Sequence, residues 1–235
     1  MSSHVERPLV LVTGAAGRVA RRTAPLLREA FRLRRLDLAE QESTADDEIV
    51  TADIRGLDAL KHACAGVRAV LHLAAQPAEA DFRSMLLPKN LDGTWSAFEA
   101  ASSAGVPRFV FASTIQTIDG YPRNVRVSPD MPPCPSSVYG ATKLFGEALG
   151  RYYAGERMGV ASIRLGGVAP ADEERVRDDD RFRSLWCAPD DLARLFVAAI
   201  TSNVTHATVI AVSPPATERF DTANPFGWTP IVSPA

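Results

Sequence analysis

A tyrosine and a lysine, Tyr139 and Lys143, stand four residues apart in the segment YGATK. In an α-helix this spacing places both side chains on one face. A free phenol has a pKa of about 10 and is a weak base at neutral pH, but a nearby ammonium group stabilises the phenolate. The pair therefore fits a site that removes a proton from an alcohol. Taken alone, it also fits an exposed aromatic residue beside a solvated lysine.

Two hydroxyl residues, Ser113 and Thr114, end a predicted strand upstream of this pair. Oxidation of an alcohol requires a base for the proton while hydride leaves the carbon. Thr114 could hold the substrate oxygen by a hydrogen bond, and Lys143 could also bind a nicotinamide ribose and fix the ring. We therefore predict a hydride-transfer site with Tyr139, Lys143 and Thr114 as its catalytic residues.

A glycine turn near the N-terminus could supply the dinucleotide site. In VLVTGAAGRVA, Gly14 and Gly17 stand where a tight turn lets backbone amides approach a pyrophosphate, and Ala20 replaces a third glycine. Asp37 ends the second predicted strand and could accept hydrogen bonds from an adenosine ribose, which favours NAD.

NADP stays possible, because Arg18 or Arg35 could meet a 2′-phosphate, although the Asp37 carboxylate would repel that group. Asp53 could bind the adenine or cap the following helix.

The elements that position these residues alternate along the chain. Continuous apolar strands that alternate with helices predict an α/β fold with a doubly wound, Rossmann-type parallel sheet. We predict strands at 8–13, 31–37, 67–75, 107–114, 159–167 and 207–212, and helices at 18–30, 58–66, 90–105, 139–156 and 190–202.

We expect one domain over 1–235. It would comprise a dinucleotide-binding core at 8–165 and a small substrate-side lobe and tail at 166–235, interleaved with the core. Residues 170–183 are highly charged and predict a flexible loop, and the proline-rich tail from Ser213 predicts no regular structure.

The helical wheel of 139–156 predicts that Tyr139 and Lys143 lie opposite the core-facing stripe of that helix. The predicted stripe comprises Leu144, Phe145, Ala148, Leu149 and Tyr152.

Composition limits the kind of partner. The chain has 235 residues, a net charge of −2 and a pI of about 6.1, which does not indicate a nucleic-acid or membrane-surface protein. No apolar stretch approaches the ~20 residues of a membrane span, and the polar start of the chain does not resemble a signal peptide. Three cysteines far apart and scattered histidines predict neither a disulfide framework nor a metal site, and we expect a cytoplasmic protein.

Taken together, these motifs resemble the extended short-chain dehydrogenase/reductase family, the NAD-dependent epimerase/dehydratases. The matching segments are the glycine turn, Asp37, HLAA at 72–75, NLDGT at 90–94, FAST at 111–114 and YGATK at 139–143. The resemblance implies a cofactor site in which Asn90 lies beside the dinucleotide. The predicted cofactor-binding residues are Gly14, Ala16, Gly17, Arg18, Val19, Asp37, Asp53, Ile54, Leu73, Ala74, Ala75, Asn90 and Lys143.

Within that family the chain is most similar to uronate dehydrogenases, in segments such as TGAAGRVA, RFRSLWCAPDD and NPFGW. This likeness implies oxidation of the C1 hydroxyl of a hexuronic acid, with Arg181 pairing the substrate carboxylate and Arg183 as a second candidate for that role. Two family positions that touch the sugar, an asparagine and a histidine, are Ile115 and Gln116 here. The predicted substrate residues are Gln76, Ser113, Thr114, Gln116 and Arg181.

Other functions stay open. A sugar epimerase or dehydratase would retain its NAD, and a non-catalytic dinucleotide sensor would keep only the fold. A related sugar acid, or a less polar alcohol or ketone, could replace uronate, because a site with fewer donors discriminates polyols less well. The resemblance also implies a small-molecule substrate and a homo-oligomer formed through the Tyr139 helix and its neighbour.

Overall fold

The computed structural model describes residues 7–41, 44 and 46–234. Residues 1–6, on which the expectation of no signal peptide partly depends, lie outside the described residues, as do 42–43, 45 and 235. In the part that is described, no helix combines the length and the apolar character that crossing a membrane requires.

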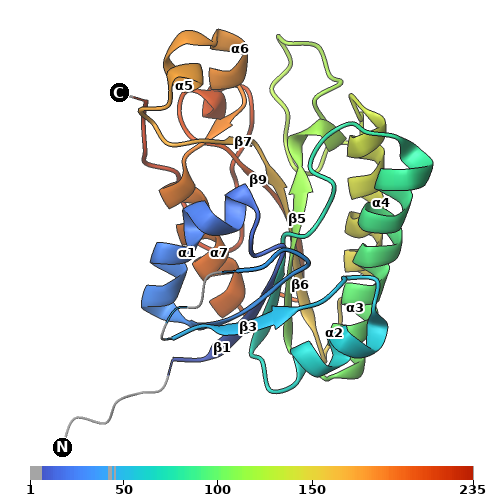
Figure 1. Cartoon of the computed structure of the whole chain (residues 1–235). Coiled ribbons are helices and arrows are strands. Elements are labelled where there is room, and N and C mark those ends of the chain that lie inside the picture. Colours follow the sequence, from blue (N-terminus) through green and yellow to red (C-terminus); the bar gives the residue numbers. More distant parts are fainter. Residues whose placement is uncertain (1–6, 42–43, 45, 235) are drawn as a thin grey trace, which may run out of the picture.

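The centre of the molecule is a seven-stranded sheet in which all neighbouring strands are parallel (Figure 1). Its order is β3-β2-β1-β4-β5-β6-β9, so the direction of strand progression reverses between β1 and β4. The strands are β1 (Leu9–Thr13), β2 (Arg32–Asp37), β3 (Glu48–Thr51), β4 (Ala69–His72), β5 (Arg108–Thr114), β6 (Gly159–Leu165) and β9 (His206–Ala211). This topology confirms the predicted Rossmann-type fold.

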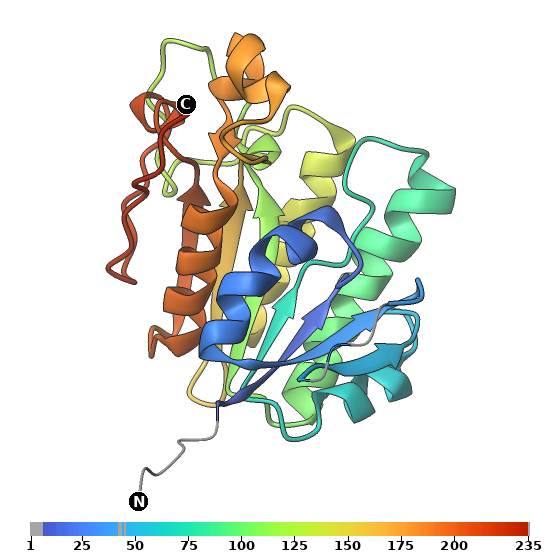
Figure 2. The same ribbon diagram turned by 60° about the vertical axis from the view of Figure 1, so that its left-hand side comes forward.

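Helices cover both faces of the sheet, as Figures 1 and 2 show. One face carries α1 (Arg18–Ala30) and α7 (Pro189–Thr201), which pack against each other; the other carries α2 (Leu57–Cys64), α3 (Gly93–Ser103) and α4 (Val138–Tyr153). A π-helical segment, η1 (Phe82–Asp92), leads directly into α3. Separate apolar clusters fill the two interfaces, one beneath α1 and α7 and one beneath α2 and α3.

The long helix α4 packs on the sheet with the face that we predicted to lie away from the core. Phe145 and Tyr152 of the predicted stripe are 36% and 79% exposed, whereas Tyr139 and Lys143 are buried. The reason is Gly146, which shares the Tyr139 face: a Cβ there would overlap the Phe111 ring of β5. The missing side chain lets the helix lie on the sheet, so the Tyr139 face is the inner one. The subunit contact expected through this helix and its neighbour stays a prediction.

The segment after β6 is ordered, and the predicted flexible loop at 170–183 is wrong. It contains α5 (Glu174–Asp178) and α6 (Asp180–Arg183), followed by β8 (Trp186–Cys187), which pairs with β7 (Gly167–Val168). The many charged residues of this segment made its apolar and helix-capping residues difficult to recognise in the sequence. Val176 and Trp186 are fully buried, and the Asp179 side chain accepts the Phe182 amide as the N-cap of α6.

The C-terminal tail is anchored by Asp191, which lies in the first turn of α7. Its buried carboxylate accepts hydrogen bonds from Ser213 Oγ (2.6 Å) and from the amides of Ile231 (3.0 Å) and Val232 (3.1 Å). Apart from the 3₁₀ turn η3 (Ala216–Glu218) and one bridge to residue 127, the described part of the tail, up to residue 234, lacks regular structure, as predicted.

Candidate dinucleotide and catalytic site

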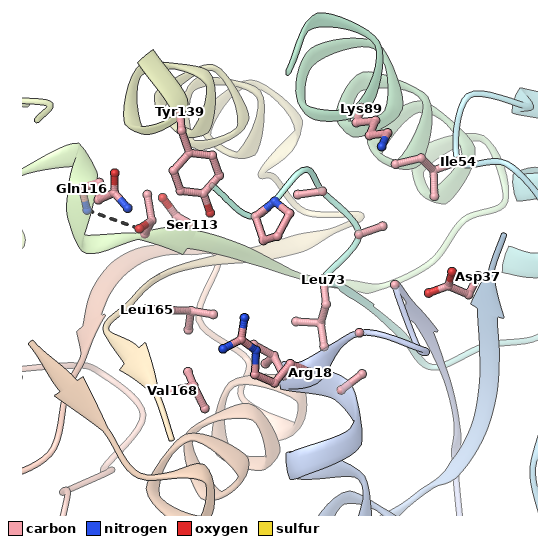
Figure 3. A pocket seen from close by; sticks show the side chains of 18 of the residues that line it. Arg18, Asp37, Ile54, Leu73, Lys89, Ser113, Gln116, Tyr139, Leu165 and Val168 are labelled. Carbon is pink, nitrogen blue, oxygen red and sulfur yellow. Dashed lines mark hydrogen bonds between the residues drawn. The ribbon is translucent and has the colours of Figure 1, made fainter. Parts of the chain in front are cut away.

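A cavity of about 930 Å³ lies at the carboxyl ends of the strands, on both sides of the point where the strand order reverses (Figure 3). Ligands of open α/β sheets bind in this position. Most predicted site residues line it: Gly14, Gly17, Arg18, Val19, Asp37, Asp53, Ile54, Leu73, Ala74, Ala75, Ser113, Thr114, Gln116 and Tyr139. Ala16, Gln76, Asn90, Lys143 and Arg181 are not among its lining residues.

The glycine turn between β1 and α1 has the shape that a dinucleotide phosphate requires. Gly14 has φ of 71°, and a Cβ there would lie 2.6 Å from the Ala74 nitrogen, so only glycine fits. Gly17 is the N-cap of α1 and has no side chain to occupy the free amides of the first turn. Those amides and the helix dipole are left for an anionic group, so the residues present fit a pyrophosphate.

Asp37 lies at the end of β2, at one side of the cavity (Figure 3). Its carboxylate accepts the amides of Ala16 (2.9 Å) and Ala39 (3.0 Å), which hold it beside the glycine turn. Each carboxylate oxygen can accept a further hydrogen bond from a ribose hydroxyl.

The two arginines that would favour NADP are directed elsewhere. Arg35 pairs with the buried Asp47 (3.4 Å), and Figure 3 draws Arg18 near Leu165 and Val168, across the cavity from Asp37. These positions favour NAD over NADP.

Asp53 and Ile54 line the same side of the cavity. The Asp53 carboxylate accepts hydrogen bonds from the Arg55 side chain (3.0 Å and 3.1 Å), which hold its pKa below the usual range. Gly56 is the N-cap of α2, so the alternative in which Asp53 caps that helix is wrong. Ile54 packs against Gly93 of α3, where a Cβ would lie 2.5 Å from its Cδ1.

Tyr139 and Thr114 meet at the other side of the cavity. Tyr139 is 7% exposed and lines the cavity together with Thr114. Burial raises the pKa of the phenol to about 12, although the neighbouring Thr114 hydroxyl opposes this rise. The phenol and the Thr114 hydroxyl therefore both line the cavity, but the pKa of the phenol is shifted in the opposite direction to the one predicted.

Lys143 explains the difference. Its Nζ donates to the Ala112 carbonyl oxygen (2.9 Å) and lies 4.9 Å from the centre of the Phe111 ring, behind the cavity wall. Burial lowers the pKa of this ammonium to about 7. The expected lowering of the phenol pKa by Lys143 is thus absent from this structure, because the ammonium is desolvated and bonded to β5.

The two hydroxyls at the end of β5 have different partners. Ser113 Oγ donates to the Glu147 carboxylate (2.6 Å), which is paired with the buried Arg164 (2.8 Å). Thr114 Oγ1 accepts the Gln116 amide (3.3 Å), drawn as a dashed line in Figure 3, and caps the 3₁₀ turn η2 (Ile115–Thr117). The Ser113 hydroxyl is therefore committed to α4, and Thr114 is the hydroxyl that meets Tyr139.

Three other polar residues hold the loops around Tyr139. The buried Asn90 exchanges hydrogen bonds with the Gln76 backbone (2.7 Å and 3.2 Å) and donates to Thr142 of α4 (3.0 Å). The side-chain oxygen of Gln116 accepts Ser137 Oγ (2.6 Å) at the start of α4. Asn90 and Gln76 thus join the loop after β4 to α4, beside the cavity rather than in its lining.

The sequence interpretation missed Glu79, whose carboxylate accepts the Tyr139 amide (2.9 Å). A carboxylate is favoured at a helix N-terminus, but this one lies 60 residues upstream, and no local pattern joins it to α4. It also missed most of the apolar lining beside Thr114. That lining comprises Ile115, Leu165, Val168, Phe182 and Leu185.

The arginines of the segment after β6 do not take the predicted places. Arg181 is exposed and does not line the cavity, and Arg183 donates to Asp180 and to the Val176 carbonyl. Arg175, which the sequence interpretation passed over, does line it.

Over the described ranges, no three His, Cys, Asp or Glu side chains are grouped as metal ligands would be. All three cysteines are free thiols, so the chain has no intramolecular disulfide in this structure.

Comparisons with known proteins agree with this geometry. Residues 10–181 match the model of the NAD dependent epimerase/dehydratase family. A uronate dehydrogenase of Pseudomonas syringae pv. tomato is 35% identical over 87% of this chain and 74% of its own length. An NAD-dependent glucose-6-phosphate dehydrogenase of Haloferax volcanii is 31% identical over 87% of this chain and 84% of its own.

Among solved structures, a variant of the uronate dehydrogenase of Agrobacterium tumefaciens, in complex with NAD, superposes with a TM-score of 0.86. It is 30% identical, and the match covers 96% of this chain and 85% of that one. The matched region spans the glycine turn, Asp37, Thr114 and the Tyr139 helix. The chain therefore belongs to the NAD-dependent epimerase/dehydratase family.

Proposed function

We propose that this protein is an NAD-dependent dehydrogenase that oxidises a hydroxyl of a sugar or sugar acid, with a hexuronic acid as the first candidate. The observation that carries the proposal is the shared cavity: a dinucleotide-type turn and Asp37 lie on one side of it, and the Tyr139–Thr114 pair on the other. The uronate and glucose-6-phosphate dehydrogenases among the relatives support a sugar as substrate.

When bound, NAD supplies the hydride acceptor. The turn at Gly14 and Gly17 and the N-terminus of α1 bind its pyrophosphate, and Asp37 accepts hydrogen bonds from its adenosine ribose. Asp37 and the distant positions of Arg18 and Arg35 favour NAD, since a carboxylate repels the 2′-phosphate of NADP.

Tyr139 removes the proton of the substrate hydroxyl, and Thr114 holds the same oxygen by a hydrogen bond. A phenol with a pKa of about 12 keeps its proton at neutral pH, so the resting site is set to donate a proton in the reductive direction. For the oxidative direction, the pKa of the phenol must fall. We infer that Lys143 stabilises the phenolate when its Nζ leaves the Ala112 carbonyl.

The alternative of an epimerase or dehydratase receives less support from the site. A dehydratase requires a further acid–base pair beside the reacting sugar. The residues that follow Thr114 are Ile115 and Gln116, and neither side chain ionises.

The test is a substrate panel with the purified protein, assayed with NAD and with NADP by the absorbance of the reduced cofactor. The panel contains glucuronate, galacturonate, glucose 6-phosphate, arabinose and glucose. We expect turnover of at least one sugar or sugar acid with NAD. Binding of NAD in a thermal-shift assay without turnover of any panel member would contradict the proposal and favour a dinucleotide sensor.

A further inference from the structure

The substrate side of the cavity is formed in part by the chain that leaves β6. Val168 of β7 and Phe182 of α6 line the cavity together with Thr114 and Tyr139. Figure 1 shows α5 and α6 above α1, at the carboxyl edge of the sheet. Within the described part of the chain, α5 and α6 pack mainly against each other rather than against the helices that cover the sheet. Their position at the cavity therefore depends on individual side-chain links.

Arg22 of α1 supplies such a link. Its guanidinium donates to the backbone carbonyl of Val168 and to the carboxylate of Glu173 (2.6 Å). Glu173 is the N-cap of α5. One side chain of α1 therefore holds both the segment that lines the cavity and the start of the helix that follows it.

The same helix begins at the proposed pyrophosphate site. Gly17 is the N-cap of α1, and Arg22 lies within the first two turns of the helix. The side chains of Arg22 and Glu173 are only 24% and 29% exposed, so solvent screens this ion pair less than one on the open surface. The connection from a bound dinucleotide to the substrate side of the cavity thus consists of a short piece of helix and one ion pair.

Arg22 differs in this respect from Arg18, which lies one turn earlier on α1. Arg18 lines the cavity and can contact a ligand directly, whereas Arg22 is not among the lining residues. The contacts of the Arg22 side chain are with Val168 and Glu173. Arg22 is therefore suited to position the cavity wall rather than to bind a ligand.

We propose that Arg22 couples the binding of NAD to the binding of the substrate. NAD orders the start of α1, Arg22 then restrains Val168 and α5, and the substrate meets a wall that is already ordered. A ligand that orders a shared segment lowers the entropic cost for a second ligand, so the two bind cooperatively without a change of shape. By linkage, the substrate raises the affinity for NAD by the same factor. The inference rests on the proposed function, because it requires that NAD and a sugar share the cavity.

The first test needs no known substrate. Amide hydrogen exchange of residues 171–180, which include α5, is followed by mass spectrometry in the full-length protein with and without saturating NAD. In the wild type, we expect NAD to slow this exchange by roughly 5-fold, the lower end of the usual coupling between two sites. In Arg22→Gln saturated with NAD, the effect should fall below about 2-fold, because the link to Val168 and Glu173 is lost.

Three further variants accompany this measurement. Arg21→Gln is the matched control, since Arg21 is the exposed neighbour on the same helix, and it should respond like the wild type. Arg22→Lys keeps the charge but not the guanidinium fork, and Glu173→Gln removes the carboxylate, so each should keep only part of the effect. Undiminished protection in Arg22→Gln would overturn the inference, as would undiminished protection in both partial variants if Arg22→Gln does not fold. A wild type that binds NAD without protection of α5 would overturn it too.

A binding measurement in Tyr139→Phe separates this inference from the proposed function. Galacturonate and glucose 6-phosphate are titrated calorimetrically with and without NAD, in Tyr139→Phe and in the double variant with Arg22→Gln. We expect NAD to tighten binding of the better ligand roughly 5-fold more in Tyr139→Phe, since direct contacts between NAD and the sugar are the same in both proteins. Equal tightening in both would overturn the inference. If neither sugar binds, the proposed function is contradicted, and the exchange of α5 still decides whether Arg22 links this helix to the NAD site.

Discussion

Lys143 donates a hydrogen bond to the carbonyl oxygen of Ala112, 2.9 Å away in the strand that ends at Thr114. The ammonium is thus fixed behind the wall of the cavity that Tyr139 and Thr114 line from within. Burial lowers the pKa of Lys143 to about 7, and burial together with the Lys143 charge lowers the pKa of His72 to about 3. The site therefore holds a cation at an energetic cost to the fold, and that cost depends on pH.

Removal of this cation should change how stability depends on pH. The pKa of Lys143 is about 7 when folded and about 10.4 in an unfolded chain. Between these values the unfolded chain binds more protons, so the free energy of unfolding rises with pH; below about pH 7 both states are protonated and the full cost of the buried charge is present. We expect Lys143→Met to lack this rise.

The measurement is urea unfolding of both proteins without NAD, at about pH 6.5 and about pH 9.5. The unfolding free energy of the wild type, relative to Lys143→Met, should increase between the two conditions. Tyr139 and the other ionisable residues are the same in both proteins, so their titration cancels to first order. Parallel pH curves would show that Lys143 is not desolvated in the folded protein.

Tyr139→Phe tests the role of the phenol. The change removes the phenol hydroxyl on the cavity side and keeps the ring that fills the wall, so we expect little change in stability. If the phenol is the proton acceptor, kcat should fall by at least about 10²-fold, a typical contribution of general acid–base catalysis.

The affinity for NAD, measured by fluorescence titration, should stay within about 2-fold, because this affinity comes mainly from the glycine turn and Asp37. Thr114→Val is the companion variant, since it removes the other hydroxyl of the pair at nearly constant volume. A Tyr139→Phe enzyme with wild-type kcat would remove the phenol from the mechanism.

Much of the fold was predictable because apolar strands and helix-spaced segments carry their signals locally. The strand ending at Thr114 lies within one residue of its predicted limits, and the helix at Tyr139 begins one residue before its predicted start and ends three residues before its predicted end. The edge strand β3 was not predicted, because its four residues EIVT are short and partly exposed. Glu48 of β3 forms ion pairs with Arg32 and Arg34 of β2 (3.0 Å and 2.7 Å), and no local pattern reveals these contacts between strands.

The candidate site was predictable where one short motif contains both the residue and the local structure that defines its role. Gly14 and Asp37 are of this kind, since each position is defined by the turn or strand end in which it lies. The orientation of Lys143 was not, because a helical wheel does not show that Gly146 directs the Tyr139 face to the sheet. Arg175 was missed because it belongs to a charged segment whose short helices become evident only when Phe182 and Val176 are packed.

Gly146→Ala tests how α4 is seated. A Cβ at this position would overlap the Phe111 ring, a fully buried residue of β5, so either the ring or the helix must move. Overpacking of this kind costs about 1–3 kcal/mol of unfolding free energy. Because Tyr139 and Lys143 share the same helix face, we also expect a lower kcat.

Gly155→Ala is the matched control for Gly146→Ala. It follows α4, and a Cβ there meets nothing within 4 Å. Urea unfolding should show no loss of stability in Gly155→Ala, and equal stabilities of the two variants would mean that the contact between α4 and β5 is looser than described here.

Asp37→Ala tests the choice of cofactor. The Asp37 carboxylate ends β2 at the cavity and accepts the amides of Ala16 and Ala39, which leaves acceptor capacity for a ribose. Loss of hydrogen bonds to a charged acceptor typically costs about 1.5–3 kcal/mol, so Kd for NAD should rise by roughly 10-fold or more. The affinity for NADP should fall less, because the carboxylate that is removed repelled the 2′-phosphate, so the preference should move toward NADP.

Asp46→Ala changes an exposed acid outside the cavity lining and should leave both dissociation constants unchanged. Titration of the wild type and of both variants with each cofactor measures the six dissociation constants. A larger loss for NADP than for NAD in Asp37→Ala would mean that this carboxylate does not read the ribose.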